Sequence, residues 1–169
     1  EHKLLYGLQV IDAAGADELE ITRSGGVDLF PAYRVHVRGA PPPSITLAAF
    51  GYSAELARQA LLKLAYEYEV FAELIVLTQL SPLDIVPVLE SAAATSRLLT
   101  IEEGSGPGGW GAEVLSACTA ALGRKLSAAR RVAGAHTPIQ AAAGLERTAL
   151  PEVEDILRAV QMIGVQSNA

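Results

Sequence analysis

The chain has 169 residues, half of them hydrophobic, which excludes global disorder and is enough for the core of one ordinary domain with an appendage. Its formal net charge of −6 at pH 7 argues against nucleic acid or a membrane as a partner, because neither polyanion gains from an acidic surface. A basic protein partner remains compatible with this charge.

The single cysteine, Cys118, cannot staple the fold, so we expect a reducing compartment and place the protein in the cytoplasm. We interpret this thiol as a small buried hydrophobe and not as a nucleophile. The sequence has no apolar run of transmembrane length and no signal-peptide pattern.

The first 31 residues look irregular. An apolar cluster around Leu4 and Leu5 needs a surface to lie on, and Asp12 to Asp28 is rich in Gly, Ala and acids, which is typical of a loop or connector. Because the chain begins with Glu1 and not with Met, we expect it to be a fragment of a longer protein.

Strands and helices then alternate. Polar and apolar residues alternate over 34–38, which predicts a half-buried strand that ends at the prolines of 39–43. Apolar runs predict further strands at 44–50, 71–77, 97–101 and 129–132. Helices are expected at 53–69, capped by Ser53, at 81–94, begun by Ser81-Pro82, at 112–122 and from Pro151 onward.

This alternation predicts an α/β fold: a three-layer, mainly parallel sheet of about five strands with helices on both faces. The helical spacing places apolar residues on one face of the first helix and of the last helix; they are Leu56, Ala60, Leu64 and Ala65, and Val153, Ile156, Leu157 and Val160. We expect this domain to span 32–165 and to end in a short tail, 166–169.

A glycine-rich stretch, Gly104 to Gly109, matches G-x-G-x-x-G between a strand and a helix, where backbone N–H groups can hold a phosphate. A dinucleotide site also needs an acid about 20 residues further on. The charged residues in that region, 124–131, are all basic. Pro107 removes one backbone donor. We therefore favour a structural interpretation, in which the glycines permit a tight turn and close packing of the helix.

Other candidate groups are weaker. Glu102 and Glu103 are neighbours on a strand and point to opposite faces, so they cannot act on one atom. His136 follows the last strand in a plausible ligand-facing loop, whereas Ser105 lacks the G-x-S-x-G context of a hydrolase nucleophile. His2 and His36 show no metal-site spacing. We expect no catalytic, cofactor-binding or metal-binding residue in this chain.

Five motifs occur in an order that resembles a known family: Leu80 to Asp84, Leu98 to Gly104, Gly108 to Glu113, Arg131 to Pro138, and Leu150 to Ile156. Together they resemble the C-terminal domain of the transketolase family, most closely that of the beta-type chain of 2-oxo acid dehydrogenase decarboxylases. The resemblance covers about 30–160. The opening residues, 1–6, resemble the end of the preceding pyrimidine-binding domain, so 1–31 is expected to be a linker.

The resemblance implies an enzyme that uses thiamine diphosphate and Mg, both bound by domains outside this chain. It implies that this domain holds subunits together, in a homodimer or an alpha/beta heterotetramer. In dehydrogenase complexes it also implies docking on the subunit-binding domain of the acyltransferase. Related chains commonly carry Asp where His136 stands and a second Pro where Gln140 stands. They can also carry an acid just before the last strand, where Arg124 to Ser127 stand here.

From this we expect two sets of interface residues. The first set faces other domains and comprises Leu4, Leu5, Gly109, Trp110, Gly111 and Glu113. The second set is a docking candidate on the last helix and comprises Glu152, Glu154 and Asp155. These three acids can equally stabilise that helix by interacting with the positive end of its dipole.

Two alternatives stay open. The parent enzyme can be a transketolase or sugar-phosphate synthase, in which ketol transfer replaces acylation of a lipoyl group. The chain can also be an independent nucleotide- or phosphate-binding domain, which uses the helix after the glycines as an anion site and gains stability from phosphate.

Overall fold

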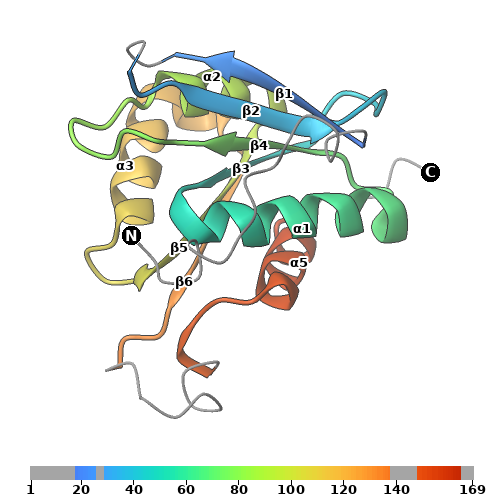
Figure 1. Cartoon of the computed structure of the whole chain (residues 1–169). Helices are drawn as coiled ribbons and strands as arrows, with labels where there is room; N and C mark the ends of the chain where they lie inside the picture. The colour runs from blue at the N-terminus through green and yellow to red at the C-terminus, as the bar shows by residue number, and fades with distance from the viewer. Residues whose placement is uncertain (1–17, 26–28, 138–147, 165–169) are drawn as a thin grey trace.

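The computed structural model describes residues 18–25, 29–137 and 148–164, which form a six-stranded sheet with helices on both faces (Figure 1). In chain order the elements are β1 (Leu19–Ser24), β2 (Ala32–Val37), β3 (Ile45–Ala49), α1 (Gly51–Tyr68), β4 (Ala72–Val76), α2 (Val86–Thr95), β5 (Arg97–Ser105), α3 (Trp110–Leu122), the 3₁₀ turn η3 (Gly123–Lys125), β6 (Ala128–Gly134) and α5 (Val153–Met162).

The sheet has the order β1-β2-β4-β3-β5-β6. Strands β4, β3, β5 and β6 run parallel to one another, whereas β2 is antiparallel to β4 and to β1. The predicted three-layer, mainly parallel α/β fold is therefore confirmed. It has six strands in place of about five.

The additional strand is β1, and the prediction of a connector was wrong there. Residues 19–24 pair with 32–37 in a register that places Leu19 opposite Val37 and Ser24 opposite Ala32. Of the six residues of β1 only Leu19 is buried, because an edge strand has one neighbour and little cover. The period-two signal is consequently weak, and pairing with β2 decides the conformation.

Two hydrophobic clusters form the core, one on each face of the sheet. Helices α1 and α5 cover one face, and α2 and α3 cover the other (Figure 1). Strand β3 lies between β4 and β5 and is buried along its whole length, as expected for a central parallel strand covered on both faces. The apolar faces predicted for the first and last helices are buried.

The starts of α1 and α2 differ from the predicted ones. Helix α1 begins at Gly51, directly after the extended Phe50, so Ser53 is buried inside the first turn and caps nothing. Helix α2 begins at Val86 and not at Ser81. Its first turn contains Pro87, and the Asp84 carboxylate accepts a hydrogen bond from the Val86 N–H. Helix α1 thus starts two residues before its predicted position, whereas α2 starts about one turn after its predicted position.

A buried group of three hydroxyls joins β3 to α2. Thr46 Oγ1 lies 2.8 Å from both Ser91 Oγ and Thr95 Oγ1, and Thr95 in turn donates to the Arg97 carbonyl oxygen at 3.0 Å. All three hydroxyl-bearing side chains are buried, so these bonds satisfy polar groups that water cannot reach.

Several predictions fall outside the described residues: the apolar cluster with Leu4 and Leu5, most of the loop that follows His136, and the tail 166–169. Among the residues that the structure describes, no helix has the length and apolar character needed to cross a membrane.

Candidate functional site

The carboxyl ends of the neighbouring strands β3 and β5 are the candidate site that the topology indicates. From β3 the chain crosses to β4 through α1 on one face, and from β5 it crosses to β6 through α3 on the other face. The connections therefore diverge between these two neighbouring strands, and doubly wound folds bind ligands at such a point. Here Phe50 comes directly after β3, and the glycine-rich stretch begins at the end of β5.

The strand β5 extends further into this stretch than the sequence predicted. It runs to Ser105, so Gly104 belongs to the strand and the loop is only 106–109. The pairing of β5 with β6 is irregular between Ile101 and Ser105. Helix α3 starts at Trp110, two residues before the expected start.

The N-terminus of α3 is occupied by a side chain of this protein. The Glu102 side chain is only 2% exposed, and its Oε1 atom accepts a hydrogen bond from the Gly111 N–H at 2.9 Å. A carboxylate is stabilised at this end of a helix by the unpaired N–H groups and by the helix dipole. Glu102 therefore takes the position that a bound phosphate would need.

The same carboxylate explains two glycines at the start of α3, Gly109 of the motif and Gly111 just after it. A Cβ atom on Gly109 would lie 2.7 Å from both Glu102 carboxylate oxygens and 2.6 Å from the Ser105 carbonyl oxygen. A Cβ on Gly111 would lie 2.5 Å from Thr100 Oγ1 and 2.8 Å from Glu102 Oε1. Only glycine permits such approach. The geometry supports the structural interpretation of the motif and not a nucleotide site.

Two aromatic rings meet at the same divergence point. The rings of Phe50 and Trp110 meet edge to face, with centroids 4.9 Å apart and an interplanar angle of 68°. They join the end of β3 to the start of α3 at the divergence point. Such a contact stabilises both ends by about 0.5–1.5 kcal/mol beyond the area that it buries.

Ser105 and His136 come together at the ends of β5 and β6. Ser105 Oγ and His136 Nδ1 are 2.7 Å apart, and Arg131 Nη1 donates to the Gly106 carbonyl oxygen at 2.6 Å. The sequence analysis treated Ser105 and His136 separately. Their position after two strands that prove to be neighbours was the signal that could have paired them. The pair is exposed, and its evident effect is to tie the glycine loop to the end of β6.

The predicted interface residues occupy two regions. Gly109, Trp110 and Gly111 lie at the divergence point, with Trp110 partly exposed, and Glu113 is exposed one turn into α3. Leu4 and Leu5 lie outside the described residues.

The acids of α5 form their own contacts. Glu152 and Asp155 form a reciprocal capping box, in which the side chain of each residue accepts a hydrogen bond from the backbone N–H of the other residue. Asp155 also pairs with Arg158, and Glu154 pairs with Lys63 of α1 at 3.0 Å. The geometry thus gives these acids a local role, which accompanies any docking role.

The Cys118 thiol is buried in α3, and burial raises its pKa to about 11. A raised pKa keeps the group protonated and unreactive near neutral pH. The interpretation as a buried hydrophobe is confirmed.

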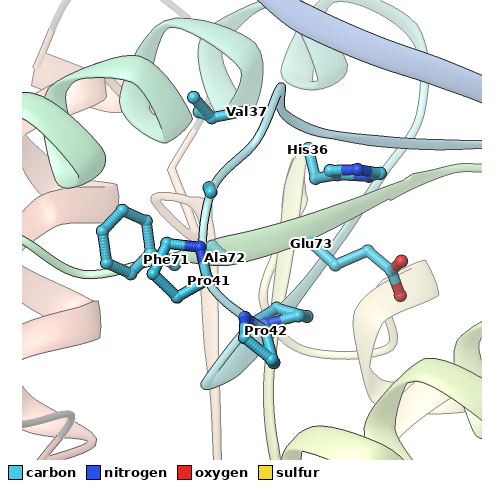
Figure 2. A pocket seen from close by; sticks show the side chains of 9 residues that line it. His36, Val37, Pro41, Pro42, Phe71, Ala72 and Glu73 are labelled. Carbon is cyan, nitrogen blue, oxygen red and sulfur yellow. The ribbon is translucent and has the colours of Figure 1, made fainter. Parts of the chain in front are cut away.

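A hollow of about 250 Å³ lies at the opposite end of the sheet, at the amino ends of β3 and β4. Figure 2 shows Pro41 and Phe71 on one side of it and His36 and Glu73 on the other. The polar groups are already paired, His36 with Glu20 at 3.5 Å and Glu73 with Arg34 at 3.3 Å. In the described part of the chain no three His, Cys, Asp or Glu side chains are arranged to hold a metal ion.

Comparison with known proteins gives a consistent result. Residues 35–156 match the family model described as "Transketolase, C-terminal domain". The pyruvate dehydrogenase E1 component subunit beta-1, mitochondrial, of Arabidopsis thaliana is 40% identical over 116 residues, which are 68% of this chain and 32% of that protein. The corresponding subunit beta-1 of Oryza sativa subsp. japonica is 40% identical over 118 residues, which are 69% of this chain and 31% of that protein.

A bacterial relative and a solved structure extend the comparison. The pyruvate dehydrogenase E1 component subunit beta of Rhizobium meliloti is 32% identical over 131 residues, 77% of this chain and 28% of that protein. A structure titled "Split gene transketolase, inactive beta4 tetramer" shares the fold with a TM-score of 0.62 at 24% identity, covering 73% of this chain and 40% of that one. The chain thus spans about a third of the length of these curated relatives.

Proposed function

Because the chain belongs to the family of transketolase C-terminal domains, we propose that it acts as the C-terminal assembly domain of a thiamine-diphosphate-dependent 2-oxo acid dehydrogenase decarboxylase component. In this proposal the parent enzyme decarboxylates a 2-oxo acid and transfers the acyl group to a lipoyl carrier, and this domain holds subunits together. Relatives that are 32–40% identical are pyruvate dehydrogenase E1 beta subunits, which favours the dehydrogenase type over the ketol-transfer type.

The observation that carries the proposal is the filled divergence point. The place where a doubly wound fold would bind a small ligand holds the Glu102 carboxylate and the Phe50–Trp110 ring pair. Such a filled site suits a domain that contributes surfaces and rigidity to an assembly.

These residues do not fit thiamine diphosphate. A diphosphate at the N-terminus of α3 would meet the Glu102 carboxylate, and the Gly111 N–H is already bonded to that carboxylate. The negative charges of the diphosphate and of the carboxylate repel each other, so the cofactor has no favourable position at this helix end. In the proposal, thiamine diphosphate and Mg are bound by other parts of the parent enzyme.

Two surfaces are proposed for the assembly. The first surface comprises Trp110 with its flanking glycines and Glu113, together with the segment that contains Leu4 and Leu5. The second comprises the acids of α5 and would meet a basic subunit-binding domain of an acyltransferase. Within the second surface Glu154 is the most informative residue, because its carboxylate lies outside the capping box and is 62% exposed. The cytoplasmic location expected from the single cysteine is part of this proposal.

Calorimetry on the purified chain tests the proposal. The titrants are thiamine diphosphate with Mg²⁺, NAD, NADP and the subunit-binding domain of a pyruvate dehydrogenase complex acyltransferase, and the oligomeric state is recorded by sedimentation. We expect heat only with the protein partner, or self-association without small-molecule heat. Micromolar binding of a nucleotide would contradict the proposal and make the glycine loop the site to map.

Glu154→Gln separates docking from local structure. The variant keeps the capping box of α5, so a fall in affinity for the subunit-binding domain at unchanged stability supports docking through this surface. Unchanged affinity would restrict the proposal to the first surface.

A further inference from the structure

The edge strand β6 borders a groove of about 370 Å³ that it shares with α5. Three arginines line this groove, Arg130 and Arg131 from β6 and Arg158 from α5, together with the exposed Met162. All three arginines are exposed. Among the described residues that line it, Asp155 is the single acid.

The backbone of β6 presents an open row of donors and acceptors. The Ala128 N–H and the Gly134 carbonyl bond toward β5, to the Ser96 carbonyl oxygen and the Gly106 N–H respectively. Because successive residues of a strand bond to opposite sides, residues 129, 131 and 133 direct their N–H and C=O groups away from the sheet. No described segment of the chain pairs with these three residues.

At the C-terminal end of β6, a segment of this chain already bonds to the outer side of the strand. The next residue of the outward series is Ala135, and its N–H donates to the Ala149 carbonyl oxygen at 2.8 Å. A chain segment therefore lies along β6 at one end of the edge. An added strand would continue in the same direction beside the remaining outward groups.

The charge along this edge indicates the occupant. The whole chain carries −6, yet the groove is basic, and Arg124 and Lys125 lie exposed just before β6. Arg130 is exposed with its side chain on the same face of the sheet as that of Val132, which packs in the core under α1 and α5. A second copy is a poor partner, because it would bring the same arginines against one another.

We propose that β6 and the adjoining face of α5 bind an extended acidic segment of another protein, which adds to the sheet as a strand. Backbone hydrogen bonds to residues 129, 131 and 133 hold the segment, and its carboxylates face Arg130 and Arg158, which lie on the side of the sheet that α5 covers. The groove borders the regions discussed above, because Asp155 lines it and Arg131 donates to the Gly106 carbonyl oxygen of the glycine loop. Its test does not depend on the function proposed above.

The test uses a fluorescein-labelled peptide of alternating Glu and Val, measured by fluorescence anisotropy with the full chain. A Lys/Val peptide of equal length controls for charge. A Glu/Pro peptide, which cannot donate backbone hydrogen bonds at alternate positions, controls for strand pairing. We expect only the Glu/Val peptide to bind, more weakly at about 1 M salt than at about 0.15 M, since the Debye length falls from about 8 to about 3 Å.

Two variants locate the binding. Arg130→Glu reverses one charge in the groove, and we expect it to weaken binding about three- to tenfold. Its matched control is Arg23→Glu, which makes the same change on the opposite edge strand, β1. Ala129→Pro removes one outward N–H and should weaken binding by a similar factor, whereas Ala129→Val keeps that N–H and should bind like the wild type.

Each other outcome overturns the proposal. Equal binding of the Glu/Val and Lys/Val peptides would remove the charge argument. Equal binding by Ala129→Pro and Ala129→Val, both shown to be folded by circular dichroism, would leave electrostatic attraction without strand addition. Self-association of the wild type that Arg130→Glu and Ala129→Pro abolish would identify a second copy as the occupant.

Discussion

The Glu102 carboxylate lies against Gly111, accepting its backbone N–H at 2.9 Å, and this contact connects the end of β5 to the first turn of α3. The carboxylate of a strand residue thus lies at the N-terminus of the following helix, where phosphate-binding loops hold their ligand. The contact therefore accounts both for the glycines around it and for the lack of space for a ligand.

Gly111→Ala should destabilise the protein. The new Cβ would lie 2.5 Å from Thr100 Oγ1, and Thr100 is buried with a stiff side chain. Overpacking costs about 1–3 kcal/mol, and alanine regains at most about 1 kcal/mol of helix propensity. We expect a net loss of about 1–2 kcal/mol in the free energy of unfolding, measured in urea.

Gly106→Ala is the control for this experiment. A Cβ on Gly106 would meet only the Ala133 Cβ at 3.8 Å, which is an ordinary contact. We expect its stability to remain within about 0.5 kcal/mol of the wild type. Equal losses for the two variants would show that loop flexibility, and not the close approach, decides the effect.

Glu102→Ala should cost about 2–3 kcal/mol, because it leaves the Gly111 N–H without its charged acceptor. Glu102→Gln keeps an oxygen acceptor and should cost about 1 kcal/mol. The double variant Glu102→Ala with Gly111→Ala should lose less than the sum of the single losses, because the first change relieves part of the clash. Strict additivity in urea unfolding would contradict the described contact.

Inorganic phosphate should leave the melting temperature of the wild type unchanged. A ligand stabilises the folded state by RT ln(1 + [L]/Kd), and the Glu102 carboxylate opposes an anion at α3. Differential scanning fluorimetry with phosphate, and with chloride at equal ionic strength, measures this effect. A rise that depends on phosphate concentration would revive the anion-site alternative.

The Cys118 thiol should react slowly with Ellman's reagent in the folded protein. Its pKa of about 11 lies about two units above the ordinary value of 9.0, so near pH 8 the thiolate fraction falls roughly a hundredfold. Burial also blocks the reagent. The rate should rise sharply in urea, and a fast reaction in the native state would show that α3 opens readily.

The pair formed by Lys63 and Glu154 should give a pH-dependent coupling between α1 and α5. The hydrogen bond from Lys63 lowers the pKa of Glu154 and raises the pKa of Lys63. The Glu154 contribution is therefore present above its ordinary pKa and is lost as the pH falls through the lowered value. The Lys63 contribution is lost only as the pH rises through its raised pKa.

A double-mutant cycle with Lys63→Met and Glu154→Gln measures this coupling. We expect a small, salt-sensitive coupling at about pH 7 that decreases as the pH falls toward about 3 and Glu154 becomes protonated. A coupling of equal size at both values would assign the effect to packing and not to charge.

The centre of the parallel sheet could be predicted because strands such as β3 and β5 are buried along most of their length and contain apolar runs. Strand β3 is the clearest example, since all its residues are buried. Strand β1 escaped prediction because its conformation depends on the pairing of Leu19 with Val37 and of its other residues with β2. No local pattern carries that information.

At the candidate site, the sequence indicated that the glycines serve close packing, but not what packs against them. A carboxylate that follows an apolar strand is usually solvated, and only the three-dimensional path of β5 turns Glu102 toward Gly109 and Gly111. The pairing of Ser105 with His136 likewise required knowledge that β5 and β6 are neighbours.

The buried hydroxyls of Thr46, Ser91 and Thr95 impose a constraint on sequence divergence. Replacing one of them by an apolar residue leaves its former partners without a hydrogen bond in a region that water cannot enter, whereas replacing all three together removes the need for partners. Substitutions at these positions should therefore accumulate as a correlated group. An alignment of homologues would show Thr46 changing in concert with two residues almost fifty positions away.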